Sequence, residues 1–200
     1  MCTLKEKIEL AKRLDKKSQY RFLPVARLQD VEYFERKFDL KLPEDYRDFV
    51  LNVANGIDDT KKKTSLFIKT NFVDDLIQLD DESFNPSIDF PIVDRTKKLA
   101  NGFHYDQLTN GNVSLKSTKC GRGIILIVKG EAKGQIWAEC LSTNSEVFPW
   151  YEDTPLDNNF NRWIDDELDD MLACLKAAKE ASKGNPLKKL RSFISKRQVS

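Results

Sequence analysis

Clustered carboxylates are the side chains in this 200-residue sequence with the greatest potential for chemistry. One group lies in a stretch without Lys or Arg, and a second follows Trp150 and Tyr151. The first comprises Asp74, Asp75, Asp80, Asp81, Glu82 and Asp89, and the second Glu152, Asp153 and Asp157. Paired acids can perform acid–base catalysis or bind a metal ion, but the spacings of a glycosidase pair or a calcium loop are absent. A solvated face is therefore the first interpretation. A protein-binding patch is the second, because acidic surfaces steer basic partners.

Other reactive residue types give little support for catalysis. His104 is the only histidine, and no partner that would orient it is evident. Cys120 beside Arg122 could be an activated thiol, but a cysteine packed in a turn is the better explanation. Gly121 and Gly123 precede an apolar run instead of following one, unlike a phosphate-binding loop. We therefore expect no enzymatic activity.

Cysteine spacing and hydropathy indicate the cellular compartment in which the protein works. The four cysteines are widely separated and form no C-x-x-C pair, so we expect no metal, no cofactor and no disulfide. The first 17 residues lack the apolar core of a signal peptide. No apolar run approaches the ~18 residues of a membrane span. These features predict a cytoplasmic protein.

Charge is unevenly distributed along the chain. Charged residues make up 32% of the sequence, yet the net charge is only +1. From Lys176 onward there are eight Lys or Arg and the single acid Glu180, so the remainder carries 25 bases and 31 acids. These counts indicate an acidic body and a basic C-terminal tail. The tail from Leu187 to Arg197 is amphipathic. We favour fold-back or disorder for it over binding to a membrane or nucleic acid.

Apolar periodicity predicts four helices, over 4–14, 28–38, 43–53 and 160–175. We expect Pro43 at the first helical position of the third helix, and Asn55-Gly56 at its end. Asp157 or Asn158 is expected to cap the last helix. Its opposite face carries five acids that we place in water: Asp165, Asp166, Glu167, Asp169 and Asp170.

Strand patterns predict a sheet between the third and fourth helices. The apolar run 124–128 fits a strand buried on both faces. Residues 135–141 and 146–150 form a predicted hairpin, and 113–116 an edge strand. A short strand is expected at 66–68, and the polar run 58–63 is expected to be an exposed loop. The predicted fold is α+β, with a mostly antiparallel central sheet, N-terminal helices and a long C-terminal helix packed on the sheet.

The order of these segments resembles the SUKH superfamily of Smi/Knr-type proteins. Members show a helix with spaced phenylalanines, then Leu-Pro-x-x-Tyr-x-x-Phe, Asn-Gly, a glycine-rich turn, an apolar strand and Gly-x-Val-Trp. The matching residues are Phe34, Phe38, Leu42, Pro43, Tyr46, Phe49, Asn55, Gly56, Cys120, Gly121, Gly123, Gly134 and Trp137. Asp39 stands where a glycine is usual. The resemblance implies a SUKH-like domain over 26–180, with a helical extension over 1–25 and a basic tail over 181–200.

The resemblance also implies a function. Bacterial members are mostly immunity proteins that neutralise a cognate toxin domain, whereas eukaryotic relatives resemble regulatory scaffolds. We therefore expect a bacterial immunity protein that occludes a basic toxin domain, with a nuclease as the leading candidate and no direct binding to nucleic acid. A regulatory protein-interaction scaffold of the yeast cell-wall-regulator type is the alternative. Contact residues would be Asp74, Asp75, Asp80, Asp81, Glu82, Trp150, Tyr151, Glu152 and Asp153. Edge packing explains Trp150 and Tyr151 at least as well as a binding hot spot does.

Overall fold

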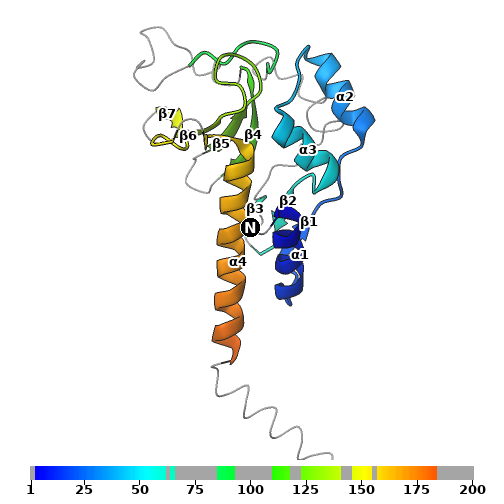
Figure 1. Cartoon of the computed structure of the whole chain (residues 1–200), viewed down its shortest axis with the longest axis vertical. Coiled ribbons are helices and arrows are strands. Elements are labelled where there is room, and N and C mark those ends of the chain that lie inside the picture. The colour runs from blue at the N-terminus through cyan, green and yellow to red at the C-terminus, as the bar shows by residue number, and fades with distance from the viewer. Residues whose placement is uncertain are drawn as a thin grey trace, which may run out of the picture. The chain divides into compact units, whose positions relative to one another are not determined.

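The computed structural model describes residues 3–61, 64–65, 85–92, 110–117, 123–140, 146–154 and 157–183 (Figure 1). The chain divides into two compact units. We call residues 18–165 the sheet unit, and residues 1–17 together with 166–200 the helical unit. Helices and antiparallel sheets occur together, which confirms the predicted α+β class.

A four-stranded antiparallel sheet forms the centre of the sheet unit. Its strands are β4 (Asn112–Ser117), β5 (Gly123–Ile127), β6 (Ile136–Cys140) and β7 (Glu146–Pro149), in the order β4-β5-β6-β7. Every residue of β5 is buried, as its continuous apolar run predicted. The hairpin of β6 and β7 and the edge position of β4 are likewise confirmed.

The core on this sheet includes an aromatic pair. Trp137 of β6 is fully buried, and its ring meets that of Phe90 edge-on, with the ring centroids 5.3 Å apart. Ile125 and Ile127 of β5 belong to the same cluster. Such edge-to-face contacts add roughly 0.5–1.5 kcal/mol to the area that the rings bury.

A second, three-stranded sheet in the same unit corrects one prediction. It contains β1 (Tyr20–Phe22), β2 (Ile57–Asp59) and β3 (Thr64–Ser65). The expectation of an exposed loop from residue 58 is wrong, because Asp58 and Asp59 belong to β2 and Asp59 is buried. The expected strand at 66–68 lies outside the described residues.

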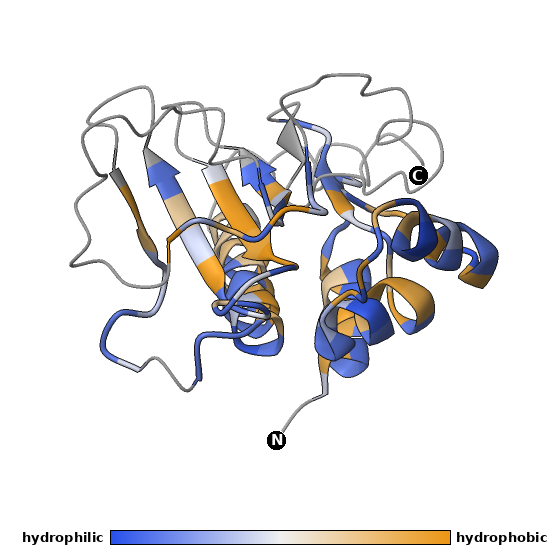
Figure 2. Ribbon diagram, turned by 90° about the horizontal axis from the view of Figure 1, so that it is seen from above, coloured by the Kyte–Doolittle hydropathy of each residue, from blue (hydrophilic) through white to orange (hydrophobic). Residues whose placement is uncertain are grey.

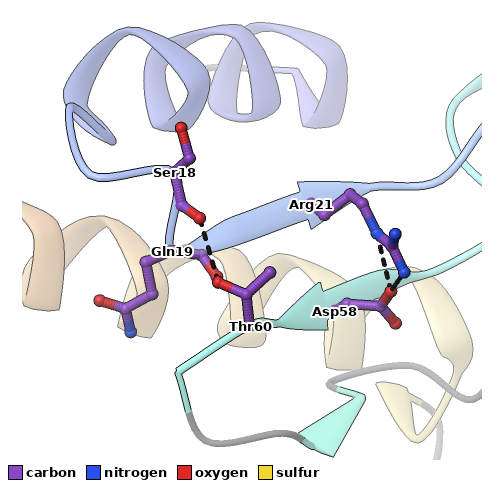
Figure 3. Close-up of polar contacts among 5 residues, drawn as sticks. All are labelled: Ser18, Gln19, Arg21, Asp58 and Thr60. Carbon is purple, nitrogen blue, oxygen red and sulfur yellow. Dashed lines mark hydrogen bonds and ion pairs between the residues drawn. The ribbon is translucent and has the colours of Figure 1, made fainter.

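Side-chain contacts explain why such a polar strand forms here. Arg21 of β1 pairs in register with Asp58 of β2, and its Nε lies 3.0 Å from the Asp58 Oδ2 (Figure 3). Beyond the strand, the Thr60 hydroxyl donates to the backbone carbonyls of Ser18 and Gln19. Opposite charges across a strand pair and satisfied polar groups replace the apolar alternation that usually marks a strand.

Two short helices precede the four-stranded sheet in the sequence. They are α2 (Leu28–Lys37) and α3 (Glu44–Asn52). Helix α3 buries Tyr46, Phe49 and Val50 of its predicted apolar stripe. Helix α2 buries Val31 and Phe34, but Leu28, predicted in the same stripe, is exposed. Figure 2 shows hydrophilic and hydrophobic residues on different sides of the helices. Between the two helices, Asp39 has a φ of 47°, a left-handed conformation that favours glycine. A glycine would adopt this conformation with less strain than Asp39.

The ends of α3 differ from the prediction by a few residues. Pro43 is the N-cap, with extended backbone, and is not the first helical residue. The helix ends at Asn52 with Val53 as C-cap, whereas Gly56, with φ of 123°, directly precedes β2. The sequence correctly predicted a glycine with positive φ at Gly56, but this glycine leads into β2 and does not end α3.

The long helix α4 (Phe160–Lys183) begins in the sheet unit. Phe160 is fully buried and meets the rings of Tyr46 and Phe49 edge-on, at 5.0 and 5.3 Å between centroids. The expected cap at Asp157 or Asn158 is wrong. Asn159 caps the helix, because its Oδ1 accepts the Arg162 N–H at 3.0 Å.

The helical unit combines α1 (Leu4–Leu14) with the remainder of α4. Thr3 and Glu6 form a capping box at the start of α1. Lys7 is buried, and its Nζ lies 2.7 Å from the Asp169 Oδ1. The predicted apolar stripe of α4 is buried at Leu168, Met171, Leu172 and Leu175. Of the five acids expected in water, Asp166, Asp169 and Asp170 are exposed, but Asp165 and Glu167 are partly buried.

Candidate protein-binding groove

The structure describes only some of the binding residues that the sequence predicted. Asp74, Asp75, Asp80, Asp81 and Glu82 lie outside the described residues, as do His104, Cys120, Gly121 and the tail from 184 onward. Their predicted roles stay predictions.

The aromatic and acidic residues after β7 form a corner at the strand end. The Trp150 N–H donates to the Ile136 carbonyl of β6 at 2.8 Å. Trp150 and Tyr151 are half-buried, whereas Glu152 and Asp153 are exposed. We call Trp150, Tyr151, Glu152 and Asp153 the strand-end corner. It presents carboxylates to solvent beside partly accessible aromatic rings.

Part of this corner is already occupied by the chain itself. The Arg162 guanidinium lies over the Tyr151 ring, 4.1 Å from its centroid. Arg162 also contacts the Thr154 hydroxyl, and the Asp157 carboxylate lies 3.9 Å from its Nη1. A cation–π contact of this kind contributes about 0.5–1 kcal/mol at exposed sites. Tyr151 therefore has a packing role, whatever else it contacts.

The residues matching the family motif lie mostly in the core or at turns. Phe34, Leu42, Tyr46, Phe49 and Trp137 are buried core residues, and Pro43 is buried at the start of α3. Phe38 packs against Phe34, with ring centroids 4.9 Å apart. Asn55, Gly56 and Gly134 lie in connecting segments, and the two glycines have positive φ. Gly123 begins β5.

Next to these motif residues the sheet unit contains an open cavity of about 840 Å³. One wall is the first turn of α3, where Pro43 is followed by Glu44, Asp45 and Asp48. Glu44 and Asp48 are exposed, and neither forms an ion pair with any described residue. We call this cavity the α3–α4 groove.

The opposite walls come from two distant segments. Lys133, Gly134 and Gln135 belong to the turn between β5 and β6. Asn158, Asn159 and Asn161 lie at the start of α4. A hydrogen bond from the Asn161 N–H to the Asp45 Oδ2, 3.2 Å long, joins the α3 and α4 walls. This bond joins residues that are 116 positions apart in the sequence.

Charge in the groove is predominantly negative. Three carboxylates, those of Glu44, Asp45 and Asp48, face one ammonium group, that of Lys133. A concave site lined mainly by one sign of charge concentrates ions of the other sign. Within the described part of the chain, no group of three or more His, Cys, Asp or Glu could hold a metal ion. The groove therefore attracts positively charged groups.

Asn158, one of the residues that line the groove, has a buried and unpaired hydrogen-bond donor. The residue is 3% exposed, and its Oδ1 accepts the buried Ile136 N–H at 3.2 Å. That bond fixes which side of the amide is oxygen. Its Nδ2 is buried and has no hydrogen-bond partner within the described structure. Leaving such a donor unpaired costs about 1–3 kcal/mol.

The groove and the strand-end corner meet at one residue. Ile136 gives its N–H to Asn158 and accepts the Trp150 N–H at its carbonyl. The acidic groove and the Trp150 side of the corner are therefore linked through successive backbone groups of β6.

One carboxylate on the sheet has a perturbed pKa for a structural reason. Glu139 of β6 lies over Gly123 of β5, where an added Cβ would be 2.1 Å from the Glu139 Oε1. Burial raises the pKa of Glu139 above its ordinary value of 4.5. A side chain at position 123 would displace this carboxyl from its place against β5.

The sequence did not reveal the α3–α4 groove. Pro43 and Gly134, two residues of the family motif, line it, but the motif by itself gave no reason to connect them. The sequence holds one signal for the groove. Three asparagines, Asn158, Asn159 and Asn161, follow Asp157 at the start of a helix, where one capping residue is sufficient.

No family model, curated protein or solved structure matches this chain. Within the described residues, no helix is long and apolar enough to cross a membrane.

Proposed function

We propose that this chain is a protein-binding module, and that it acts as an immunity protein that binds and neutralises a cognate toxin domain. The observation that carries the proposal is the acidic α3–α4 groove, linked at Ile136 to the strand-end corner. Interface hot spots combine aromatic anchors with charged residues in this way. The ordered resemblance to Smi/Knr-type proteins supplies the biological context.

Neutralisation would proceed by occlusion and would need no reaction. Nucleases and other toxins that act on nucleic acids hold phosphate with Lys and Arg. Carboxylates of the groove and of Glu152 and Asp153 would pair with those cations, while Trp150 anchors the contact. A standard interface of roughly 1,600 Å² is sufficient for a stable complex. Complementary charge would chiefly accelerate association.

The test is affinity capture from the source organism's lysate with the tagged full chain, at low and at moderate salt. We expect one stoichiometric partner that matches the end of a large exported protein. Its partial loss at moderate salt would support the acidic interface, because salt screens exposed charges beyond about 8–10 Å. Recovery of several housekeeping proteins in place of one partner would contradict the proposal and favour a regulatory scaffold.

A further inference from the structure

We propose that the basic segment 187–197 folds back along α4 and packs on one exposed face of that helix, so that the chain covers its own tail. We call this face the outer stripe of α4. Its residues lie in the helical unit and are Asp166, Asp170, Ala173, Ala177 and Ala181. The contact lies within this chain and goes beyond the proposed function.

The outer stripe is exposed over its whole length. Residues spaced three or four positions apart share one face of a helix, and every residue of the stripe is exposed. The Asp170 carboxylate forms no hydrogen bond or ion pair with any described residue. A different face of α4 is buried, at Leu168, Met171, Leu172 and Leu175. The outer stripe is therefore available to a second helix.

The sequence of the segment 187–197 indicates a helix that needs a partner. Its placement lies outside the described residues, but its apolar side chains recur at helical spacing at Leu187, Leu190 and Ile194, with Phe193 beside them. An amphipathic helix is stabilised mainly by burying its apolar face. The same segment holds five cations and no acid: Lys188, Lys189, Arg191, Lys196 and Arg197. It therefore suits an apolar surface that also carries carboxylates.

The connection to α4 allows the chain to reverse. Gly184, Asn185 and Pro186 directly follow Lys183, the last residue of α4. Glycine commonly follows the last helical residue, and proline cannot continue a helix. Antiparallel helices are joined by loops of about 2–5 residues, so this connection is long enough.

An antiparallel register brings complementary groups together. With the reversal centred on Asn185, Phe193 comes to lie beside Ala177, and Arg197 beside Ala173. Small side chains let helix axes approach to about 8 Å, so the Phe193 ring packs on the alanines. Arg197 is then one helical turn from Asp170 and can form an ion pair with its carboxylate.

The covalent link favours this occupant over others. An anionic membrane or a nucleic acid would satisfy the cations of the tail but would leave the outer stripe exposed. The fold-back contact satisfies the cations and covers the stripe at once. A short linker also gives the tail an effective concentration on the order of millimolar at the stripe, which a second copy of the chain does not reach in dilute solution.

The experiment measures nuclear Overhauser effects in the isotopically labelled full chain. We expect contacts between the Phe193 ring protons and the methyl groups of Ala173 and Ala177. A mixture of labelled and unlabelled chains separates contacts within one chain from contacts between two copies. Absence of these contacts, or their appearance only between chains, would overturn the inference.

Variants of the outer stripe test whether docking hides the tail. A173Q combined with A177Q adds bulk without charge, and glutamine is a good helix former, so α4 should persist while the tail is released. This variant should bind vesicles of phosphatidylserine and phosphatidylcholine at least about fivefold more tightly than the wild-type chain. Removal of residues 184–200 from the variant should abolish the gain.

The matched control is A178Q, which changes an exposed alanine of α4 outside the outer stripe. It should bind the vesicles as the wild-type chain does. Equal vesicle binding by the wild-type chain and the paired variant, or an equal gain in A178Q, would contradict docking of the tail on the stripe.

Discussion

Glu35 is the residue whose removal should most clearly damage the wall that carries the groove's acids. Its side chain is 1% exposed, accepts two hydrogen bonds from the segment that leads into α3, and forms an ion pair with Arg47 of α3. Oε1 accepts the Leu42 N–H at 3.0 Å and lies 3.3 Å from the Arg47 Nε. Oε2 lies 3.0 Å from the Lys41 Nζ. One buried carboxylate on α2 therefore fixes the start of α3.

The expected cost of E35A follows from these contacts. Loss of the acceptor leaves the buried Leu42 N–H unpaired, which costs about 1–3 kcal/mol. The Arg47 side chain is one-third exposed, so water compensates for much of its loss and leaves about 0.5–1 kcal/mol. Lys41 is mostly exposed and should contribute little. The free energy of unfolding should fall by about 3 kcal/mol.

Urea unfolding followed by circular dichroism measures this change. E35Q keeps an oxygen for the Leu42 N–H and loses the charge, so it should cost only about 1 kcal/mol. E32A, on the same helix but without the contacts of Glu35, should change stability by less than about 0.5 kcal/mol. A cost below about 1 kcal/mol for E35A, or equal costs for E35A and E32A, would refute the reasoning.

Two further predictions concern turns and pH. At Gly111, which has φ of 61°, a Cβ would lie 2.4 Å from the Phe90 backbone nitrogen and 2.9 Å from the Lys129 carbonyl oxygen. G111A should therefore lower the free energy of unfolding by about 2–4 kcal/mol. G134A, with positive φ but open space around its Cβ, should cost only about 1 kcal/mol in the same urea assay. Equal costs would show that the close approach at Gly111 is unimportant. Because burial raises the pKa of Glu139, the folded state holds this proton more tightly than the unfolded state. Stability should then fall as pH rises from the ordinary value of 4.5 through the raised pKa, and E139Q should flatten that part of the profile. A wild-type profile unchanged by E139Q would contradict it.

Periodic segments were predictable because their burial is encoded locally. The apolar stripe from Phe160 to Leu175 repeats at helical spacing, so α4 could be found without tertiary information. The continuous run of β5 likewise identified a strand covered on both faces. Errors at Pro43 and Asn159 amount to one or two residues at helix ends, where several residues can serve as caps.

Features built from distant segments could not be predicted in this way. Strand β2 is three residues long and two-thirds acidic, and it is held by partners such as Arg21, 37 positions away. The α3–α4 groove needs three segments to meet, and only the fold brings Asp45 to Asn161. The acids chosen from the sequence at 74–82 lie outside the described residues, so that patch stays a prediction.

Neutralisation in cells is the most direct test of the central claim. The toxin domain of the captured partner would be expressed from an inducible promoter together with this chain, and growth would be measured. We expect the wild-type chain to restore growth and E44Q combined with D48N to restore it less. E131Q, which changes an exposed acid outside the groove, should match the wild type. Continued growth arrest, despite a stable complex of the two purified proteins, would contradict an immunity function.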